Sequence, residues 1–329
     1  MEFVQSVLRG DRLALSRLLS CVENDVPEGR LALDALFPYT GKAHLIGVTG
    51  APGTGKSSLV NQLALQIRKK EKRVAIVAVD PSSPFTGGAV LGDRVRMRDL
   101  AGDSGVFIRS MASRGSLGGL AAATAAVTQV FDAAGFEVIL IETVGAGQSE
   151  VDIARLAHTT IVVEAPGLGD DIQAIKAGIL EIADILVINK ADRPGVETTE
   201  RSLRTMLELA HPVRKVFRHH GQMMELNDGV VPQEGLWIPP VQRTVATDGR
   251  GVPELLESIE RHVAHLRANG DWMRRERARL QAEFDLLLQE ALVSRFLAKI
   301  PPSKVEGMLQ LIQERRISPR EAVYQLLEN

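Results

Sequence analysis

The sequence is poor in cysteine, has no long hydrophobic run and carries no excess of one charge. Its single cysteine, Cys21, excludes an intrachain disulfide and is compatible with a reducing compartment. No stretch of about 18 apolar residues occurs, and no basic segment precedes an apolar run at the N-terminus, so neither a membrane span nor a secretion signal is predicted. The 39 basic and 41 acidic residues leave a net charge of −2, which gives no electrostatic attraction to nucleic acid or to a membrane surface. We expect a folded cytoplasmic protein that binds neither.

The hydrophobic pattern predicts an α/β protein of three parts. Hydrophobic residues make up 45% of the 329 residues, which is enough for one large domain with smaller additions. Apolar strand-like runs alternate with helical segments over residues 41–265, which predicts a P-loop nucleotide-binding domain with a mostly parallel sheet. Residues 1–40 have helical spacing and are expected to form an N-terminal extension. Residues 266–329 are also helical, and their apolar stripes are buried either on the parent domain or on a second copy, so we expect a dimerisation element there.

A phosphate-binding loop is predicted between the strand-like run 45–49 and a helix with apolar residues at helical spacing. Glycines in this loop allow successive backbone N–H groups to point at phosphate oxygens from a helix N-terminus. Lys56 is expected to reach the outer phosphates, and the hydroxyl of Ser57 to bind Mg²⁺. The residues expected to contact the nucleotide here are Gly50, Ala51, Pro52, Gly53, Thr54, Gly55, Lys56, Ser57 and Ser58.

The tetrapeptide 189–192, Asn-Lys-Ala-Asp, predicts that the bound base is guanine. It follows the buried-strand pattern 184–188, at the strand end where parallel sheets bind ligands. The carboxylate of Asp192 can accept from both N1–H and the N2 amine of guanine, a pair of donors that adenine lacks. Asn189 is expected to brace the loop, and the aliphatic part of Lys190 to cover the base. Backbone N–H groups of Thr244, Val245 and Ala246 are expected to close over the base.

Three carboxylates are candidates for the Mg²⁺ site and for the catalytic set, together with Lys56. Asp80 and Glu142 close apolar strand-like runs, whereas Asp93 lies in a glycine-rich stretch. Strand-end carboxylates alternatively cap helices or face solvent. Three residues after Glu142, Gly145 is small enough for its backbone N–H to approach the terminal phosphate and sense its presence.

Three glycine-rich stretches are predicted to be loops that a γ-phosphate orders. They cover residues 84–120, 143–149 and 166–171. The alternative is that they are ordinary connections. The charged run 274–279 is interpreted as a solvated helix face, because charge runs on helices usually are.

Five motifs in this order resemble the methylmalonyl-CoA-mutase-associated GTPases, the MeaB/ArgK group. They are GAPGTGKSS at 50–58, VDPSSP at 79–84, GDR at 92–94, IETVGAGQSE at 141–150 and NKAD at 189–192. The resemblance implies a homodimeric G-protein chaperone, or metallochaperone, that gates adenosylcobalamin loading into a cobalamin-dependent acyl-CoA mutase and protects or reactivates that enzyme. It also implies GTP hydrolysis to GDP that is slow until the partner stimulates it.

By position, the resemblance assigns Lys56 and Ser57 to phosphate and metal, and it makes Asp80, Asp93 and Glu142 the acidic cluster. Asn189, Lys190 and Asp192 would select guanine, and 167–176 would be a third switch read by the mutase. The stretch 215–236, with its two adjacent histidines, is longer than the family pattern predicts.

Two other functions share this nucleotide-domain pattern. One is a metal-insertion GTPase, which needs cysteine or histidine ligands that the pair His219-His220 supplies poorly. The other is a protein kinase linked to amino-acid transport, for which the sequence lacks a His-Arg-Asp catalytic loop.

Overall fold

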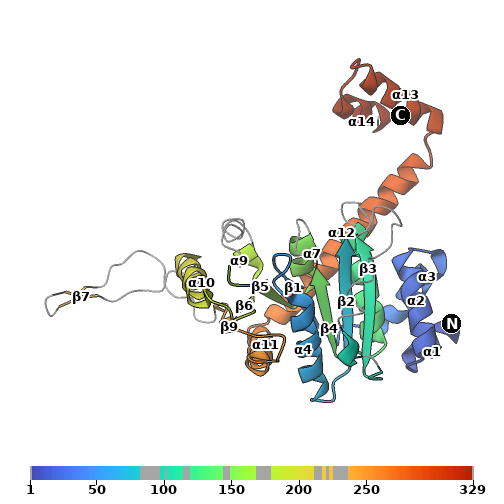
Figure 1. Cartoon of the computed structure of the whole chain (residues 1–329). Helices are drawn as coiled ribbons and strands as arrows, with labels where there is room; N and C mark the ends of the chain where they lie inside the picture. The colour runs from blue at the N-terminus through green and yellow to red at the C-terminus, as the bar shows by residue number, and fades with distance from the viewer. Residues whose placement is uncertain are drawn as a thin grey trace. The chain divides into compact units, whose positions relative to one another are not determined.

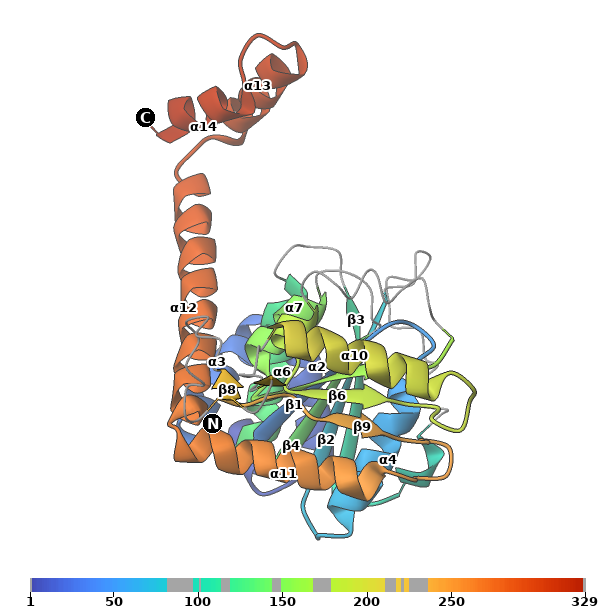
Figure 2. The ribbon, with the colours of Figure 1, turned by 90° about the vertical axis from the view of Figure 1, so that its left-hand side faces the viewer.

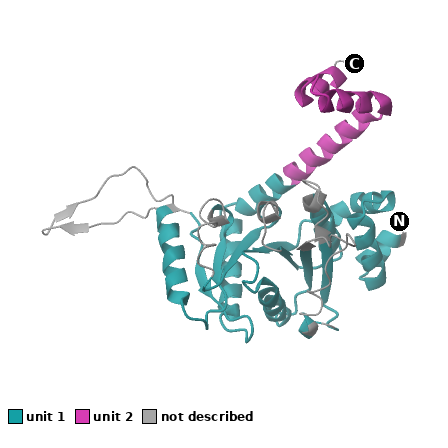
Figure 3. Cartoon of the chain, turned by 45° about the horizontal axis from the view of Figure 1, so that its top comes forward, with its two compact units in different colours: residues 1–279 teal, residues 280–329 magenta. Residues whose placement is uncertain are grey.

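The computed structural model describes residues 2–81, 97–100, 102–113, 119–143, 149–167, 179–210, 217–219, 222–224 and 236–327. The chain divides into two units, residues 1–279 and residues 280–329, which Figure 3 colours separately.

A seven-stranded sheet forms the centre of the first unit, in the order β3-β2-β4-β1-β5-β6-β9 (Figure 1). Each pairing described within it is parallel, as the sequence predicts. The strands are β1 (His44–Thr49), β2 (Val74–Pro81), β3 (Val106–Ser113), β4 (Val138–Thr143), β5 (Thr159–Glu164), β6 (Ile185–Ile188) and β9 (Val241–Arg243). Central strands of this kind are apolar throughout because helices cover both of their faces.

Alternate residues of the strands enter two separate cores. Ile139 and Ile141 of β4 pack with the N-terminal helices and α6, whereas Leu140 between them packs on the opposite face with α4 and α11. Figure 2 shows α4 and α11 crossing this second face. The helices of the unit are α1 (Glu2–Leu8), α2 (Arg12–Glu23), α3 (Pro27–Leu36), α4 (Lys56–Arg68), α6 (Gly119–Ala133), α7 (Ser149–Leu156), α9 (Ile179–Ile182), α10 (Val196–Ala210) and α11 (Val252–Ala268), with 3-10 turns η1 (Phe37–Tyr39) and η2 (Arg98–Leu100).

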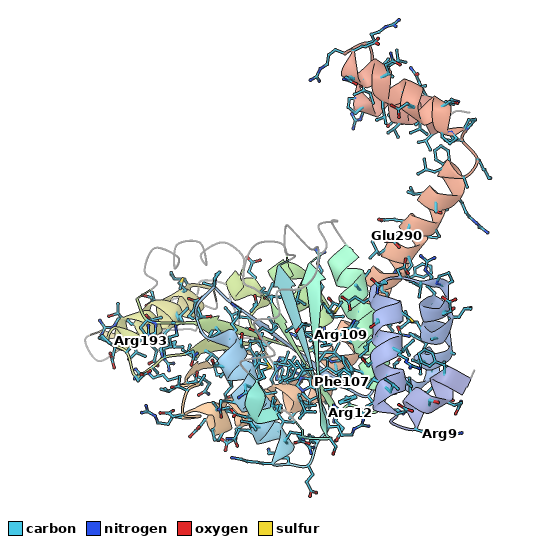
Figure 4. All side chains as sticks on the ribbon, turned by 45° about the vertical axis from the view of Figure 1, so that its right-hand side comes forward. Arg9, Arg12, Phe107, Arg109, Arg193 and Glu290 are labelled. Atoms are coloured by element: carbon cyan, nitrogen blue, oxygen red, sulfur yellow. The ribbon has the colours of Figure 1, made fainter. Side chains whose placement is uncertain are left out.

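The N-terminal helices are attached to the edge strand β3. Asp11 caps α2 by accepting hydrogen bonds from the backbone of its first turn, at 2.8 and 3.0 Å. Arg12 donates to the carbonyl oxygen of Val106 at 2.9 Å and lies 5.1 Å from the ring centroid of Phe107 (Figure 4). Arg109 of β3 forms an ion pair with Glu23 of α2. The helical extension expected over residues 1–40 therefore packs on the sheet.

Two sequence interpretations are wrong. The stretch 84–120, predicted to be a glycine-rich loop, contains η2 and the eight-residue strand β3, because Val106 and Met111 are buried and β3 pairs along the length of β2. The charged run 274–279 is not a solvated face throughout. The side chains of Glu276 and Arg279 are only 15% and 14% exposed, because they pair with each other and Glu276 also contacts His158.

Helix α12 (Asp271–Leu297) begins in the first unit and ends in the second, which also contains α13 (Pro302–Gln313) and α14 (Pro319–Leu327). Ser318 caps α14 by accepting from the backbone of Glu321 at 3.1 Å. A separate two-stranded sheet is formed by β7 (Phe217–His219) and β8 (Gln222–Met224), which pair antiparallel within the stretch 215–236. Among the described residues, no helix is long and apolar enough to cross a membrane.

Candidate nucleotide-binding site

The predicted phosphate loop connects the carboxyl end of β1 to the first turn of α4. Two of its glycines are required by close approach of other chain segments. A Cβ on Gly50, whose φ is +135°, would lie 2.1 Å from the carbonyl oxygen of Val163. At Gly55, with φ +91°, a Cβ would lie 2.5 Å from Nδ2 of Asn189. Larger residues at either position would both strain the backbone and displace its neighbours.

The loop folds around the ammonium group of Lys56. Lys56 is 5% exposed, and its Nζ donates to the carbonyl oxygens of Gly50 at 2.7 Å and Ala51 at 3.0 Å. A buried positive charge therefore lies inside the loop, next to the helix N-terminus, where anions are also stabilised by the helix dipole.

Ser57 and Glu142 lie together although 85 residues separate them in the sequence. The hydroxyl of Ser57 donates to Oε1 of Glu142 at 2.6 Å, and Glu142 is 5% exposed. Strand pairing explains the approach, because Glu142 of β4 lies in register with Val48 of β1 and Ala78 of β2. A hydroxyl and a carboxylate are hard oxygen ligands, the donor set that Mg²⁺ prefers, so these residues fit the ion.

The structure describes only part of the other residues assigned to the acidic cluster. Asp80 lies near the carboxyl end of β2, where its backbone is in register with Ala112 of β3, and its side chain is outside the description. Asp93 and Gly145 fall outside the described residues, as do most residues of the three glycine-rich stretches and of the third switch. Their roles stay predictions. Across the described residues, no group of three His, Cys, Asp or Glu side chains could hold a metal ion.

Asn189 joins the phosphate loop to the two segments predicted to contact the base. Its Nδ2 donates to the carbonyl oxygen of Thr54 at 2.8 Å. Its Oδ1 accepts from the hydroxyl of Thr244 at 3.1 Å and from the backbone N–H of Ala246 at 3.0 Å. The side chain is buried, so each of these bonds is shielded from water. The predicted brace is thus present in the geometry.

Lys190, the next residue of the tetrapeptide, also contacts the phosphate loop. Nζ of Lys190 donates to the carbonyl oxygen of Gly53 at 2.5 Å, which extends its aliphatic stem along the loop. Lys190 has a φ of +57°, an uncommon left-handed conformation for a residue with a side chain and one that clusters at functional sites. Asp192 is exposed, and Val245, in the chain segment that Asn189 holds, is buried.

A further buried carboxylate, not predicted from the sequence, lies at this edge of the sheet. Glu164 is 2% exposed and ends β5, which lies between β1, the strand before the phosphate loop, and β6, the strand before the tetrapeptide 189–192. Its carbonyl oxygen accepts from the backbone N–H of Asn189 at 2.8 Å. The criterion applied to Glu142, a carboxylate closing an apolar run, would have identified it.

The model of the methylmalonyl Co-A mutase-associated GTPase family, MeaB, matches residues 15–300. The chain belongs to this family. A protein of Pyrococcus abyssi named as a GTPase is 42% identical over 99% of the chain and 95% of its own length. The GTPase ArgK of Escherichia coli is 34% identical over 99% of the chain and 95% of its length. Among solved structures, one titled LAO/AO transport system kinase superposes with a TM-score of 0.70 at 26% identity, covering 99% of this chain and 96% of that one. The MeaB family is thus a family of GTPases, and the phosphate-loop fold is shared.

Proposed function

We propose that this MeaB-family GTPase binds GTP and GDP at the carboxyl edge of the sheet and serves as a chaperone for a cobalamin-dependent acyl-CoA mutase of the methylmalonyl-CoA mutase type. In this role its nucleotide state would gate adenosylcobalamin loading and protect or reactivate the mutase. The nucleotide part rests on one observation, the side chain of Asn189 that joins the phosphate loop to the guanine-binding loop. The mutase part is supported by the family name.

The chain's own residues would do the following. Backbone N–H groups of residues 50–58 and the ammonium of Lys56 bind the phosphates, exchanging the carbonyl contacts that Lys56 makes in the loop. Asp192 accepts from N1–H and the N2 amine of guanine, and an adenine there would leave the carboxylate without donors, which costs about 1–3 kcal/mol. Hydrolysis then depends mainly on positioning of the attacking water and on charge stabilisation.

Ser57 and Glu142 would hold Mg²⁺, and Asp80 and Asp93 are proposed to complete its acidic surroundings. The ion, when bound, neutralises charge on the outer phosphates. Gly145 would bring a backbone N–H to the terminal phosphate. Among the described residues no arginine is assigned to the transition-state charge, and we propose that turnover is slow until the mutase completes the site.

The proposed assembly is a cytoplasmic homodimer built from an extension (1–40), a GTPase domain (41–265) and a helical region (266–329). Its dimer contact would use the helical region. Apolar side chains of the second unit support this proposal, because they are 44–59% exposed within one chain. They include Phe284, Leu287, Leu288, Leu292 and Val293.

The test is GTP turnover by the purified chain, alone and with a cobalamin-dependent acyl-CoA mutase from the same source, with ATP as control nucleotide. We expect GTP-specific turnover that the mutase raises by orders of magnitude. Lys56→Ala should abolish tight GTP binding, while Lys69→Ala, an exposed lysine at the other end of the same helix, should leave it unchanged. Fast turnover without the mutase, or retained micromolar affinity in Lys56→Ala, would contradict the proposal.

A further inference from the structure

A buried polar cluster lies at the amino edge of the sheet, at the strand ends opposite the nucleotide-binding loops. It joins the starts of β5 and β6 to α11 and to the first turns of α12, all within the first unit. We call it the amino-edge cluster. Its members are His158, Asp184, His262, Trp272, Arg275 and Glu276.

Asp184 is the centre of this cluster. Its two carboxylate oxygens accept from both terminal nitrogens of Arg275, each at 2.7 Å, and one of them also accepts from the backbone N–H of Thr160 at 2.8 Å. Nε2 of His262 lies 3.2 Å away. Burial acts to raise the pKa of Asp184, but the adjacent imidazole of His262 and the hydrogen bonds from Arg275 outweigh it and lower the pKa to about 2. Asp184 is therefore a buried anion that requires its cationic partner.

His158 attaches the same helix to the phosphate-loop strand. Its Nδ1 accepts from the backbone N–H of Leu45 in β1 at 3.1 Å, which places the ring proton on Nε2, 3.1 Å from the carboxylate of Glu276. The ring stacks on Trp272 with centroids 4.0 Å apart and planes 11° apart. Arg275 also donates to the carbonyl oxygen of His158 at 2.9 Å.

The attachment of α12 is almost entirely polar. None of its residues, Asp271–Leu297, is buried, whereas the preceding helix α11 buries Leu255, Ile259 and Leu266. Ion pairs and one aromatic stack thus hold the first turns of α12, without the apolar burial that normally fixes a helix. Such an attachment can open without exposing a hydrophobic core.

Strand β6 connects this attachment to the guanine-binding loop. Asp184 immediately precedes the four residues of β6, and Asn189 immediately follows them. At about 3.3 Å per residue, the two side chains lie on the order of 16 Å apart along one strand. We propose that Asp184 is a positioning residue for the guanine-binding loop, and that its ion pair with Arg275 couples the attachment of α12 to nucleotide occupancy. This inference rests on the proposed guanine-nucleotide site.

Linkage makes the coupling reciprocal. If bound nucleotide and the Arg275 ion pair favour the same position of β6, nucleotide strengthens the attachment of α12, and loss of Arg275 weakens nucleotide binding by the same factor. We expect about a tenfold loss, within the roughly 5- to 150-fold range typical of such coupling.

The chain's two tryptophans make the test direct. The sequence has only Trp237 and Trp272. Trp272 stacks on His158, and Trp237 donates to the carbonyl oxygen of Asp184 at 2.7 Å, so intrinsic fluorescence reports this cluster. Acrylamide quenching is measured with and without GDP, and GDP affinity is measured by calorimetry. The variants are Arg275→Met and Arg275→Lys, which keeps the charge but loses the paired hydrogen bonds.

Arg274→Met is the matched control, because Arg274 is 73% exposed and pairs only with Asp271 of its own helix among the described contacts. We expect GDP to reduce acrylamide quenching in the unsubstituted chain. Arg275→Met should raise quenching and weaken GDP binding about tenfold, and Arg275→Lys should change both quantities less. Arg274→Met should match the unsubstituted chain. Raised quenching with unchanged GDP affinity in both Arg275 variants, or no effect of GDP on quenching, overturns the coupling. Failure of the unsubstituted chain to bind GDP at all overturns the proposed function instead, and the coupling with it.

Discussion

Replacing Asn189 by alanine should weaken both the folded state and nucleotide binding, because one side chain connects three segments. Its amide donates to Thr54 and accepts from Thr244 and Ala246, over distances of 2.8–3.1 Å. Those segments belong to the phosphate loop and to the loop that follows β9. The side chain is 2% exposed, so water cannot replace the lost contacts without entering the core.

The expected loss of stability can be worked out from the backbone groups that lose their hydrogen-bond partner. In Asn189→Ala the carbonyl oxygen of Thr54 and the N–H of Ala246 lose their partner, and these residues are 0% and 5% exposed. Each unsatisfied group costs about 1–3 kcal/mol, whereas the hydroxyl of Thr244 can turn to another acceptor. We expect the free energy of unfolding to fall by about 2–4 kcal/mol. Because the two loops also lose their mutual position, GDP affinity should fall at least about tenfold.

Denaturant unfolding without nucleotide and calorimetry with GDP measure the two effects separately. Asn189→Asp is the informative second variant, since it keeps the acceptor oxygens but places an oxygen against the carbonyl of Thr54. Asn24→Ala serves as control, because Asn24 is exposed and bonds only to the neighbouring turn in the described contacts, at 2.7 Å. An unfolding free energy of Asn189→Ala within about 0.5 kcal/mol of the unsubstituted chain, with unchanged GDP affinity, would refute this reasoning.

Two further predictions concern stability. The carboxylate of Asp132 accepts from the backbone N–H groups of residues 41–43, including Ala43 at 2.9 Å. Asp132→Ala should therefore lower the free energy of unfolding, measured with denaturant, by about 2–3 kcal/mol. An unchanged unfolding midpoint would contradict this. Burial lowers the pKa of His158 while Glu276 opposes the shift, so the unfolded chain, with a histidine pKa near 6.5, binds more protons. The free energy of unfolding should therefore fall as pH drops below 6.5, by at most about 1.4 kcal/mol per pH unit for this group. His158→Gln should make the free energy of unfolding depend less steeply on pH between pH 7 and 5. Equal slopes in the two proteins would show that His158 does not contribute.

The places of the phosphate loop and of the tetrapeptide 189–192 in the fold could be predicted because their sequence signals are local. Glycine spacing and strand-end position are properties of short segments, and the register of a parallel sheet then brings Ser57 to Glu142 across 85 residues. Strand β3 was missed for a local reason too. It carries polar residues such as Arg109 and Ser110 and is flanked by glycine-rich segments, so its pattern resembles a loop until its pairing with β2 is known.

The amino-edge cluster could not be predicted in the same way, because its contacts join residues 91 and 118 positions apart. A run of arginine and glutamate on a helix is compatible with a solvent-exposed face or with a face that pairs with a buried group. Only the presence of such a group elsewhere in the fold distinguishes the two. The sequence did contain that partner, since Asp184 immediately precedes β6, whose four residues are all apolar. A carboxylate at such a position needs a cation or several N–H donors to offset its loss of water. Applied to strand starts as well as strand ends, the same criterion that identified Glu142 would have required a cation or several N–H donors for Asp184, and Arg275 of α12 and the backbone of Thr160 supply them.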